Sequence, residues 1–278
     1  MPVFSRIAAT SLLLAATAAS QLLNAAPLTG TLEHNTLTIG SDLTYPPYAY
    51  LEHKQPAGFD PQFMQLISHQ LGAEPRFVDT RFANLVLGVN ANRFDVVASA
   101  LYVTPERARQ VDFLGYLKTG SSLMVRSNDS FKPQRPEDLC GKRVGSIKGA
   151  SWIAKLAKVS TDYCTANGKA PIDSREFPTS PEAAQALLSQ GVDVQFEDAA
   201  VAKIISEKLN GRISISSQQL IYPVVVGLAV HKGNAQLLGE LQSAFTAIKQ
   251  NGSYATLLAR YNLAEPSRQE ITDALGAQ

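Results

Sequence analysis

Cysteine and histidine are the side chains best able to form cross-links or hold a metal, and this sequence has few of them. It contains two cysteines, Cys140 and Cys164, and four scattered histidines. No histidine is spaced with a cysteine as a zinc site requires, so we expect no metal site. In an oxidising compartment we expect the cysteines to form a disulfide, which removes roughly 3 kcal/mol of unfolded-chain entropy; two separate buried thiols are the alternative.

The other reactive side chains form no catalytic set that the sequence reveals. Their spacing supports neither a Ser-His-Asp arrangement nor a pair of buried carboxylates for acid–base chemistry. We therefore expect a protein that has no cofactor and is not an enzyme.

The N-terminal segment has the pattern of a secretory signal peptide. Arg6 precedes an apolar run over residues 7–19, and the first acidic residue is Glu33. An uncleaved membrane anchor is the alternative, although polar side chains interrupt a run that is already short for about 30 Å of hydrocarbon. The segment therefore predicts export.

The predicted signal peptide spans residues 1–25, with cleavage after Ala25 and with Ala19 or Ser20 as alternative positions. No cysteine precedes Cys140, so the sequence offers no site for an N-terminal lipid anchor. We expect the mature chain in the periplasm, without membrane insertion.

The bulk composition is that of a globular protein larger than one hydrophobic core usually serves. The 278 residues are 45% hydrophobic and 18% charged, with a formal net charge of +1. This charge gives no field that attracts nucleic acid or an anionic membrane, and no Lys/Arg cluster supplies one locally. We expect a monomer of two lobes that binds no nucleic acid.

Short β-branched runs alternate with helical patterns along the chain. In the first part, strands are predicted over residues 37–40, 76–78 and 94–98, and helices over 63–71 and 82–90. In the second part, a strand is predicted over 192–196 and helices over 151–158, 181–190 and 199–209. The alternation predicts an α/β fold in which mostly parallel sheets are flanked by helices.

The chain is expected to pass between two lobes twice. Residues 26–121 and 224–278 are predicted to form the first lobe, and residues 122–223 the second. The C-terminal helices, predicted from residue 235 onward, have no second lobe of their own to join and should pack on the first lobe. A cleft between the lobes, at the carboxyl ends of the strands, is where such sheets bind ligands.

Several short motifs occur in a fixed order along the mature chain. They are Ser41-Asp-Leu-Thr-Tyr-Pro-Pro-Tyr48, Gly58-Phe-Asp60, Thr104-Pro-Glu-Arg107, Val111-Asp-Phe113, Asp138-Leu-Cys-Gly-Lys-Arg-Val-Gly145 and Asn251-Gly-Ser-Tyr254. In this order the sequence resembles the polar amino acid binding proteins of ABC transporters, solute-binding family 3. The resemblance covers nearly all of the mature chain and implies a two-lobed periplasmic binding protein fold of type II.

The resemblance assigns the two ends of a zwitterionic ligand to two charged residues. Arg107 matches the arginine that binds the ligand carboxylate, for which its planar fork is suited. Without the resemblance, a surface arginine paired with Glu106 or Asp112 would be favoured. Asp198 matches the aspartate that accepts hydrogen bonds from the ligand ammonium, and capping of the following helix is its alternative role.

Aromatic side chains are expected to enclose the side chain of the ligand. Tyr45 and Phe82 match the two aromatic positions that sandwich it in the family, with a turn residue and a core residue as the alternatives. Asp42 matches a position that meets a polar or cationic tip, or else it caps its own turn.

Three expected ligand contacts lie in two segments whose sequence differs from the family pattern. Ala100 and Tyr102 stand in the segment where the family has small residues, so Tyr102 replaces a small hydroxyl that helps hold the ammonium. Ser151 is the nearest substitute for a missing threonine in the second lobe, with a plain helix cap as its alternative. We expect all three residues to contact the ligand.

By resemblance the chain is the binding component of an ABC importer that closes by a hinge and docks on a membrane permease. Asp42 and Glu197 favour a polar or cationic amino acid as the ligand, followed by an opine or another compact cationic solute. Glu197 itself is expected to be solvated more than bound.

Two other functions use the same fold. A periplasmic cyclohexadienyl dehydratase is one, but those enzymes have a glutamate three residues after the cleft aspartate, where this chain has Val201. A sensor module that presents its ligand to a membrane receptor is the other.

Overall fold

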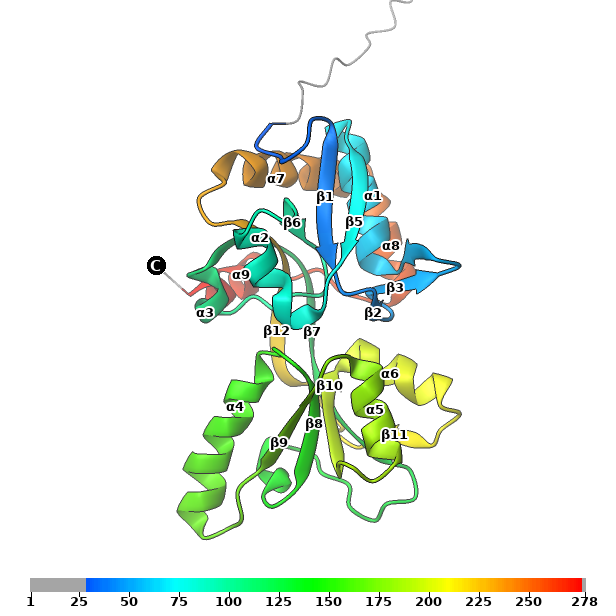
Figure 1. Ribbon diagram of the computed structural model, residues 1–278, viewed down its shortest axis with the longest axis vertical. Coiled ribbons are helices and arrows are strands. Elements are labelled where there is room, and N and C mark those ends of the chain that lie inside the picture. Colours follow the sequence, from blue (N-terminus) through cyan, green and yellow to red (C-terminus); the bar gives the residue numbers. More distant parts are fainter. Residues whose placement is uncertain (1–28, 277–278) are drawn as a thin grey trace, which may run out of the picture.

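The protein consists of two lobes joined by a narrow waist, as the computed structural model shows (Figure 1). The model describes residues 29–276, so the predicted signal peptide lies outside the described residues. Both lobes are sheets covered by helices, which confirms the predicted α/β class. Among residues 29–276, none of the helices is long and apolar enough to cross a membrane.

The first lobe is built on a parallel core of three strands. β1 (Thr36–Ser41) lies between β5 (Glu74–Asp79) and β6 (Val96–Val97), and Ile39 is paired with Phe77 on one side and with Val96 on the other. The helices of this lobe are α1 (Phe59–Leu71), α2 (Leu85–Asn90), α3 (Pro105–Ala108), α7 (Ala235–Gln250), α8 (Ser253–Tyr261) and α9 (Arg268–Leu275). β1 and β6 are buried in the middle of the sheet, whereas β5 is an edge strand with exposed polar residues.

The second lobe repeats this plan with later segments of the chain. β8 (Arg143–Ile147) pairs in parallel with β9 (Asp173–Phe177) and with β10 (Val194–Asp198). The helices of this lobe are α4 (Trp152–Val159), α5 (Ser180–Leu188) and α6 (Ala199–Lys208). The carboxyl ends of β8 and β10 face the first lobe (Figure 1).

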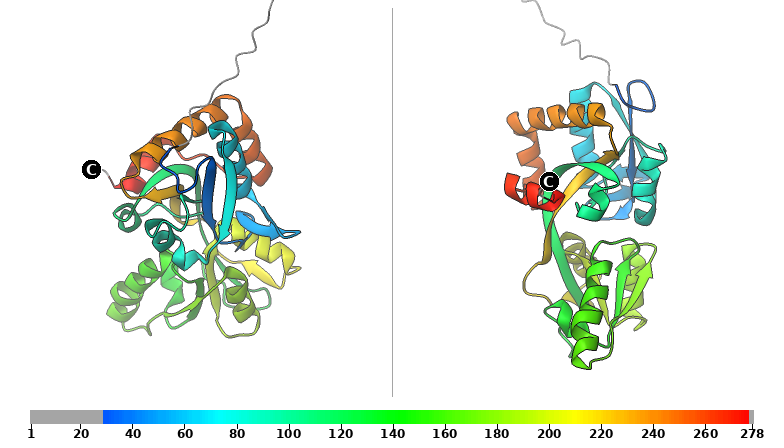
Figure 2. Two further views of the ribbon diagram at one scale, coloured as in Figure 1. Left: turned by 45° about the horizontal axis from the view of Figure 1, so that its top comes forward. Right: turned by 90° about the vertical axis from the view of Figure 1, so that its left-hand side faces the viewer.

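Two long antiparallel strands, β7 (Val111–Arg126) and β12 (Ile221–His231), pass through the waist and serve both lobes. They join the strands into one hydrogen-bonded sheet in the order β5-β1-β6-β12-β7-β10-β8-β9, with β11 (Ile213–Ile215) paired to β7. Figure 2 shows both strands running from lobe to lobe along one side of the molecule. The predicted lobe boundaries fall within β7 and β12, so the connections are sheet rather than coil.

Aromatic packing fixes the C-terminal helices to the first lobe. The ring of Phe63 on α1 stacks on Tyr116 at a centroid distance of 4.8 Å and meets the edge of Phe245 at 5.4 Å. Phe245 on α7 contacts Tyr254 on α8 at 4.9 Å. The two helices α7 and α8 therefore pack against α1 of the first lobe.

Local structure departs from prediction around residue 82. One helix was expected over residues 82–90, but a 3-10 turn (Phe82–Asn84) precedes α2. The Asp42 carboxylate accepts a hydrogen bond from Phe82 N at 2.8 Å, which fixes the start of this turn. A small sheet of β2 (Thr44–Tyr45), β3 (Ala49–Glu52) and β4 (Gln55–Ala57) was not predicted.

The predicted disulfide is present. Cys140 and Cys164 are joined across a sequence separation of 24, and their Cα atoms lie 5.5 Å apart. Cys140 follows the turn Pro136–Leu139, and Cys164 ends the helical segment that continues α4. The disulfide therefore ties the helical segment Ser160–Cys164 to the connection between the turn Pro136–Leu139 and β8.

Candidate functional site

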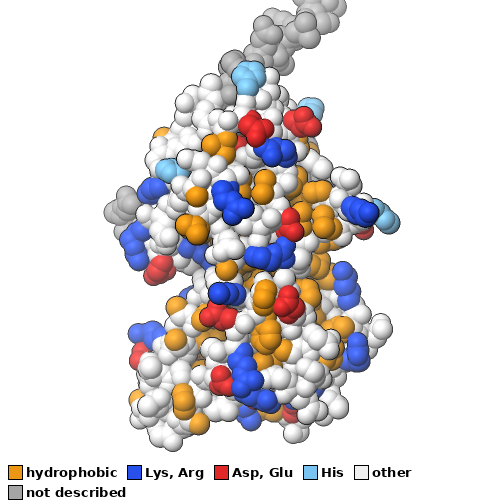
Figure 3. Space-filling model, viewed as in Figure 1, with side chains coloured by type: hydrophobic (Ala, Val, Ile, Leu, Met, Phe, Trp, Pro, Cys, Tyr) orange, Lys and Arg blue, Asp and Glu red, His pale blue; other side chains and the backbone are white. Residues whose placement is uncertain are grey.

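A cavity of about 1530 Å³ lies at the waist and is lined by both lobes and by the two long strands. Figure 3 shows the surface narrowing at this level, with Lys, Arg, Asp and Glu side chains on both sides of the waist. Among the predicted ligand-binding residues, Tyr102, Arg107 and Ser151 line the cavity. The other five are buried in the layer between the lobes or directly behind it.

Arg107 lies at the junction of the lobes. It sits on the one-turn helix α3, which Thr104 caps by accepting a hydrogen bond from Arg107 N at 3.3 Å. The guanidinium donates from Nη1 to Tyr102 O at 2.8 Å and from Nη2 to Gly149 O of the second lobe at 3.0 Å. Burial lowers the pKa of Arg107 to about 10, so it remains a cation at neutral pH.

No carboxylate of the described residues lies within ion-pair distance of this cation, although the charge of the exposed Glu106 acts on it. Asp112, one of the partners expected for a surface arginine, pairs instead with Lys232 at 2.6 Å. Arg107 Cζ lies 5.5 Å from the centre of the Phe82 ring, a cation–π distance. A guanidinium has five N–H donors, and two are used in the contacts above, so others remain for an anion.

Asp198 ends β10 and has no exposed surface. Its Oδ1 accepts from Ala200 N at 2.8 Å and from Val201 N at 3.2 Å, which caps α6. Its Oδ2 accepts from Tyr102 Oη at 2.7 Å and from Thr119 Oγ1 at 2.9 Å. The predicted capping role is therefore present, and the second oxygen binds two hydroxyl groups from the first lobe and the hinge strand.

Glu197 is also fully buried, so the expectation that it is solvated is wrong. Its Oε1 accepts from Tyr45 Oη at 2.6 Å and from Asp198 N at 2.9 Å. Its Oε2 accepts from Ser180 Oγ and from Gln195 Nε2. The residue is buried because β10 ends against the first lobe, which the sequence around it does not indicate.

Tyr45 and Phe82 form part of an aromatic layer on the first lobe. The Tyr45 ring lies 6.1 Å from Tyr48 and 6.4 Å from Phe82. Asp42 lies behind this layer and accepts from Thr44 Oγ1 at 2.6 Å and from Phe82 N. Arg81 Nη1 lies 3.1 Å from the same carboxylate. The structure therefore gives Asp42 its alternative role, that of a local cap.

Ala100 has a left-handed backbone, with φ of 46°, and its amide donates to Asp60 Oδ2 at 2.8 Å. Asp60 also accepts from Tyr116 Oη at 2.5 Å, and burial raises its pKa to about 7. Asp60 thus positions the segment that carries Tyr102. Sequence analysis did not assign it this role, although the Gly58-Phe-Asp60 motif contains it.

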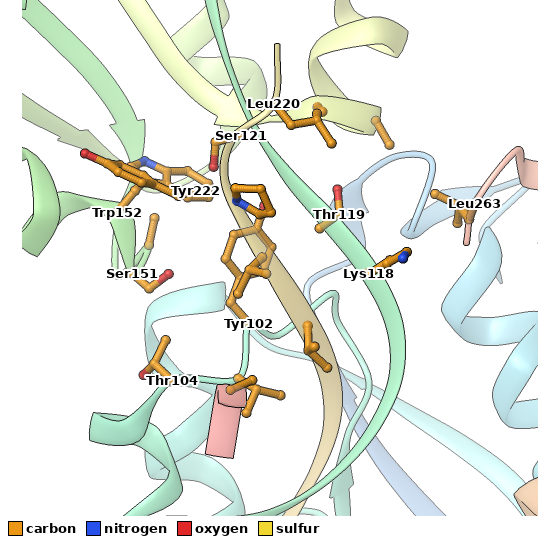
Figure 4. A pocket seen from close by; sticks show the side chains of 18 of the residues that line it. Tyr102, Thr104, Lys118, Thr119, Ser121, Ser151, Trp152, Leu220, Tyr222 and Leu263 are labelled. Atoms are coloured by element: carbon orange, nitrogen blue, oxygen red, sulfur yellow. The ribbon is translucent and has the colours of Figure 1, made fainter. Parts of the chain in front are cut away.

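Four further residues of the cavity wall were missed. Trp152 meets the Tyr102 ring edge-on at 5.7 Å, and Lys155 Nζ lies 4.4 Å over the ring of Tyr222. Ser121 Oγ is buried and makes no hydrogen bond with any of residues 29–276. Figure 4 shows the Ser121 hydroxyl pointing into the cavity, on the side where Trp152 and Tyr102 lie. Trp152 directly follows Ser151 and is the single tryptophan of the chain, which was the available signal.

The buried Glu197 predicts a pH-dependent stability. Burial raises its pKa from 4.5 to about 7, so the native state holds a proton that the unfolded chain releases between these values. Its contribution to stability is therefore full below about pH 4.5 and is lost as the pH rises through 7. We expect Glu197→Gln to reduce the fall in unfolding free energy between pH 5 and 7.5, measured by urea denaturation.

Burial also raises the pKa values of Asp60 and Asp198, so these two residues add to the fall in stability with rising pH. In Glu197→Gln the pH dependence of the unfolding free energy should therefore become smaller without disappearing. Glu207→Gln, on an exposed position of α6, is the matched control and should leave the slope unchanged. An identical pH dependence in Glu197→Gln and the parent chain would contradict the assignment.

The two α/β lobes share two hinge strands and enclose a polar and aromatic cavity. This architecture defines a class of protein that binds small solutes by closing around them. The sequence matches the family model of bacterial extracellular solute-binding proteins, family 3, over residues 37–264. The chain belongs to this family.

Individual relatives are distant but span most of the chain. The L-cystine-binding protein TcyJ of Escherichia coli K12 is 24% identical over 82% of this chain and 83% of its own length. A solved ancestral arginine-binding protein bound to arginine is 28% identical, with a TM-score of 0.75 over 82% of this chain and 98% of that one. The ancestral amino acid-binding protein AncCDT-1, described as a precursor of cyclohexadienyl dehydratase, is 25% identical, with a TM-score of 0.72 over 82% and 95%.

Proposed function

We propose that this protein is the substrate-binding component of an ABC importer and that it closes around a small amino acid-like ligand with a carboxylate. The observation that carries the proposal is Arg107. It is a half-buried cation without an ion-pair partner in the described chain, it lines the cavity, and it donates to the second lobe at Gly149 O. A ligand carboxylate beside it gains charge-assisted hydrogen bonds where both lobes meet.

The relatives support an amino acid-like ligand in particular. Their names specify cystine, arginine or amino acids, and the two solved structures share this fold. The leader predicted over residues 1–25 supports a periplasmic location, where such a component meets its permease.

We also propose that the protein binds its ligand without catalysing a reaction. A dehydratase needs an acid placed against the leaving group. Val201, at the position where those enzymes have a glutamate, is buried in α6 and offers no proton. Asp198 and Glu197 are fully buried and are not among the residues that line the cavity, so neither is placed against a ligand there.

The mature chain from residue 26, freed of carried ligand by unfolding and refolding, should be screened by thermal shift. The panel contains free amino acids, their N-acetyl and 2-oxo derivatives, opines, polyamines, betaines and prephenate. A saturable rise in melting temperature with any amino acid-like carboxylate supports binding, since a ligand at 100 times its Kd adds about 2.7 kcal/mol. Responses confined to polyamines, or product formed from prephenate, would reject the proposal.

A further inference from the structure

We propose that Tyr102 is a specificity-determining residue that closes the acidic subsite of the cleft, so that the ligand is a carboxylate without a free amine, such as an N-acylated amino acid or a 2-oxo acid. The inference rests on the proposed function and narrows it. The ligand inferred here differs from the free polar or cationic amino acid that the sequence favours.

Asp198 has no free capacity to accept further hydrogen bonds. A carboxylate offers about four lone-pair sites, and Asp198 already accepts four hydrogen bonds, from Ala200 N, Val201 N, Thr119 Oγ1 and Tyr102 Oη. The residue has no exposed surface. A ligand ammonium can therefore reach Asp198 only by displacing one of these donors.

The neighbouring acid offers no substitute. Glu197 has no exposed surface, and its two oxygens are hydrogen-bonded with Tyr45, Ser180, Gln195 and Asp198 N. Both carboxylates at the end of β10 thus point their oxygens at protein donors. A buried cation without an acceptor costs several kcal/mol, so this layer disfavours a ligand amine.

Tyr102 is held by contacts of its backbone and of its ring. Its backbone bridges to Val226 of β12, and the next amide, Val103 N, donates to Val225 O at 2.8 Å. Its carbonyl accepts from Arg107, and its ring lies against Trp152 of the other lobe. These contacts fix the backbone and the ring, so the phenol is held in place against Asp198 and an amine must compete with a positioned donor.

The cavity wall also carries polar groups that remain open to a ligand. Arg107 retains unused N–H donors, Ser121 Oγ has no partner, and Lys155 lies over Tyr222 without an ion pair in the described chain. These groups suit a carboxylate and a neutral polar group such as a carbonyl. The acids that do line the cavity, Glu106, Glu207, Glu270 and Asp273, are all exposed at its rim.

The test compares matched ligands on matched variants by calorimetry. Each L-amino acid is paired with its N-acetyl and 2-oxo derivative, and each pair is titrated into the parent chain and Tyr102→Ser. We expect the parent chain to bind a derivative at least tenfold more tightly than the free amino acid. Tyr102→Ser, which opens Asp198 Oδ2, should shift this ratio toward the free amino acid by tenfold or more.

Tyr222→Ser is the control variant, because it removes a similar aromatic side chain from the cavity wall without touching Asp198. Its affinities are expected to fall for both members of a pair, with the ratio unchanged. If Tyr102→Ser does not fold, the ratio in the parent chain decides the question.

Two results would overturn the inference. If the parent chain binds a free amino acid as tightly as its derivatives and Tyr102→Ser brings no gain, Tyr102 does not exclude amines, and the proposed function stands. If the folded parent chain binds no member of any pair, the proposed function fails together with the inference.

Discussion

Arg107→Ala is expected to weaken ligand binding by about 100-fold or more, which corresponds to about 3 kcal/mol. The substitution leaves the ligand carboxylate buried without its cation. It also removes the hydrogen bonds from the guanidinium to Tyr102 O and to Gly149 O, the second of which joins the two lobes. Calorimetric titration of the refolded variant with the ligand found by the thermal-shift screen measures the loss.

Two variants separate this effect from a general loss of positive charge. Arg107→Lys keeps the charge but loses the planar fork, so its affinity should lie between those of the parent chain and Arg107→Ala. Arg109→Ala removes an exposed arginine at the end of the same helix, outside the cavity wall, and should bind like the parent chain. Unchanged affinity in Arg107→Ala would remove the central contact of the proposed function.

The double variant Cys140→Ser/Cys164→Ser is expected to lose roughly 3 kcal/mol of unfolding free energy. The disulfide closes a loop across a sequence separation of 24, and opening it restores conformational freedom to the unfolded chain. Urea denaturation of the parent chain and the double variant, each with and without a thiol reductant, measures the difference.

The reductant supplies the internal control. It should destabilise the parent chain to the level of the double variant and leave the double variant unaffected. If the parent chain unfolds at the same urea concentration under both conditions, the bond contributes nothing to stability, and the entropic explanation is wrong.

Periodicity predicted much of the architecture because it reports local burial. The alternation of apolar strands and amphipathic helices indicated parallel sheets, and the predicted helix over residues 199–209 corresponds to α6 at Ala199–Lys208. The predicted and observed bounds of an element differ where a side chain distant in the sequence binds its end. Asp42 does this at the start of the turn Phe82–Asn84.

The site itself was predicted in parts. Tyr102, Arg107 and Ser151 lie on the cavity wall, and Asp198 caps α6 at the interface of the lobes. Ser121 and Lys155 could not be selected from the sequence, because a serine in a strand and a lysine on a helix have no local signal for facing a cavity. Glu197 was misjudged for the same reason, since its burial depends on Tyr45, which is 152 residues away in the chain.

The sequence by itself determined the elements, their alternation and the cysteine pair, because strand and helix periodicity and the number of cysteines are local properties of the chain. Only the tertiary structure decided that β7 and β12 carry one sheet through the waist. It also decided that the Tyr102 phenol donates a hydrogen bond to Asp198, which is 96 residues away in the sequence. The physical reason is that a hydrogen-bond acceptor is open or filled according to what the fold brings to it. Neighbouring residues in the sequence do not specify those contacts.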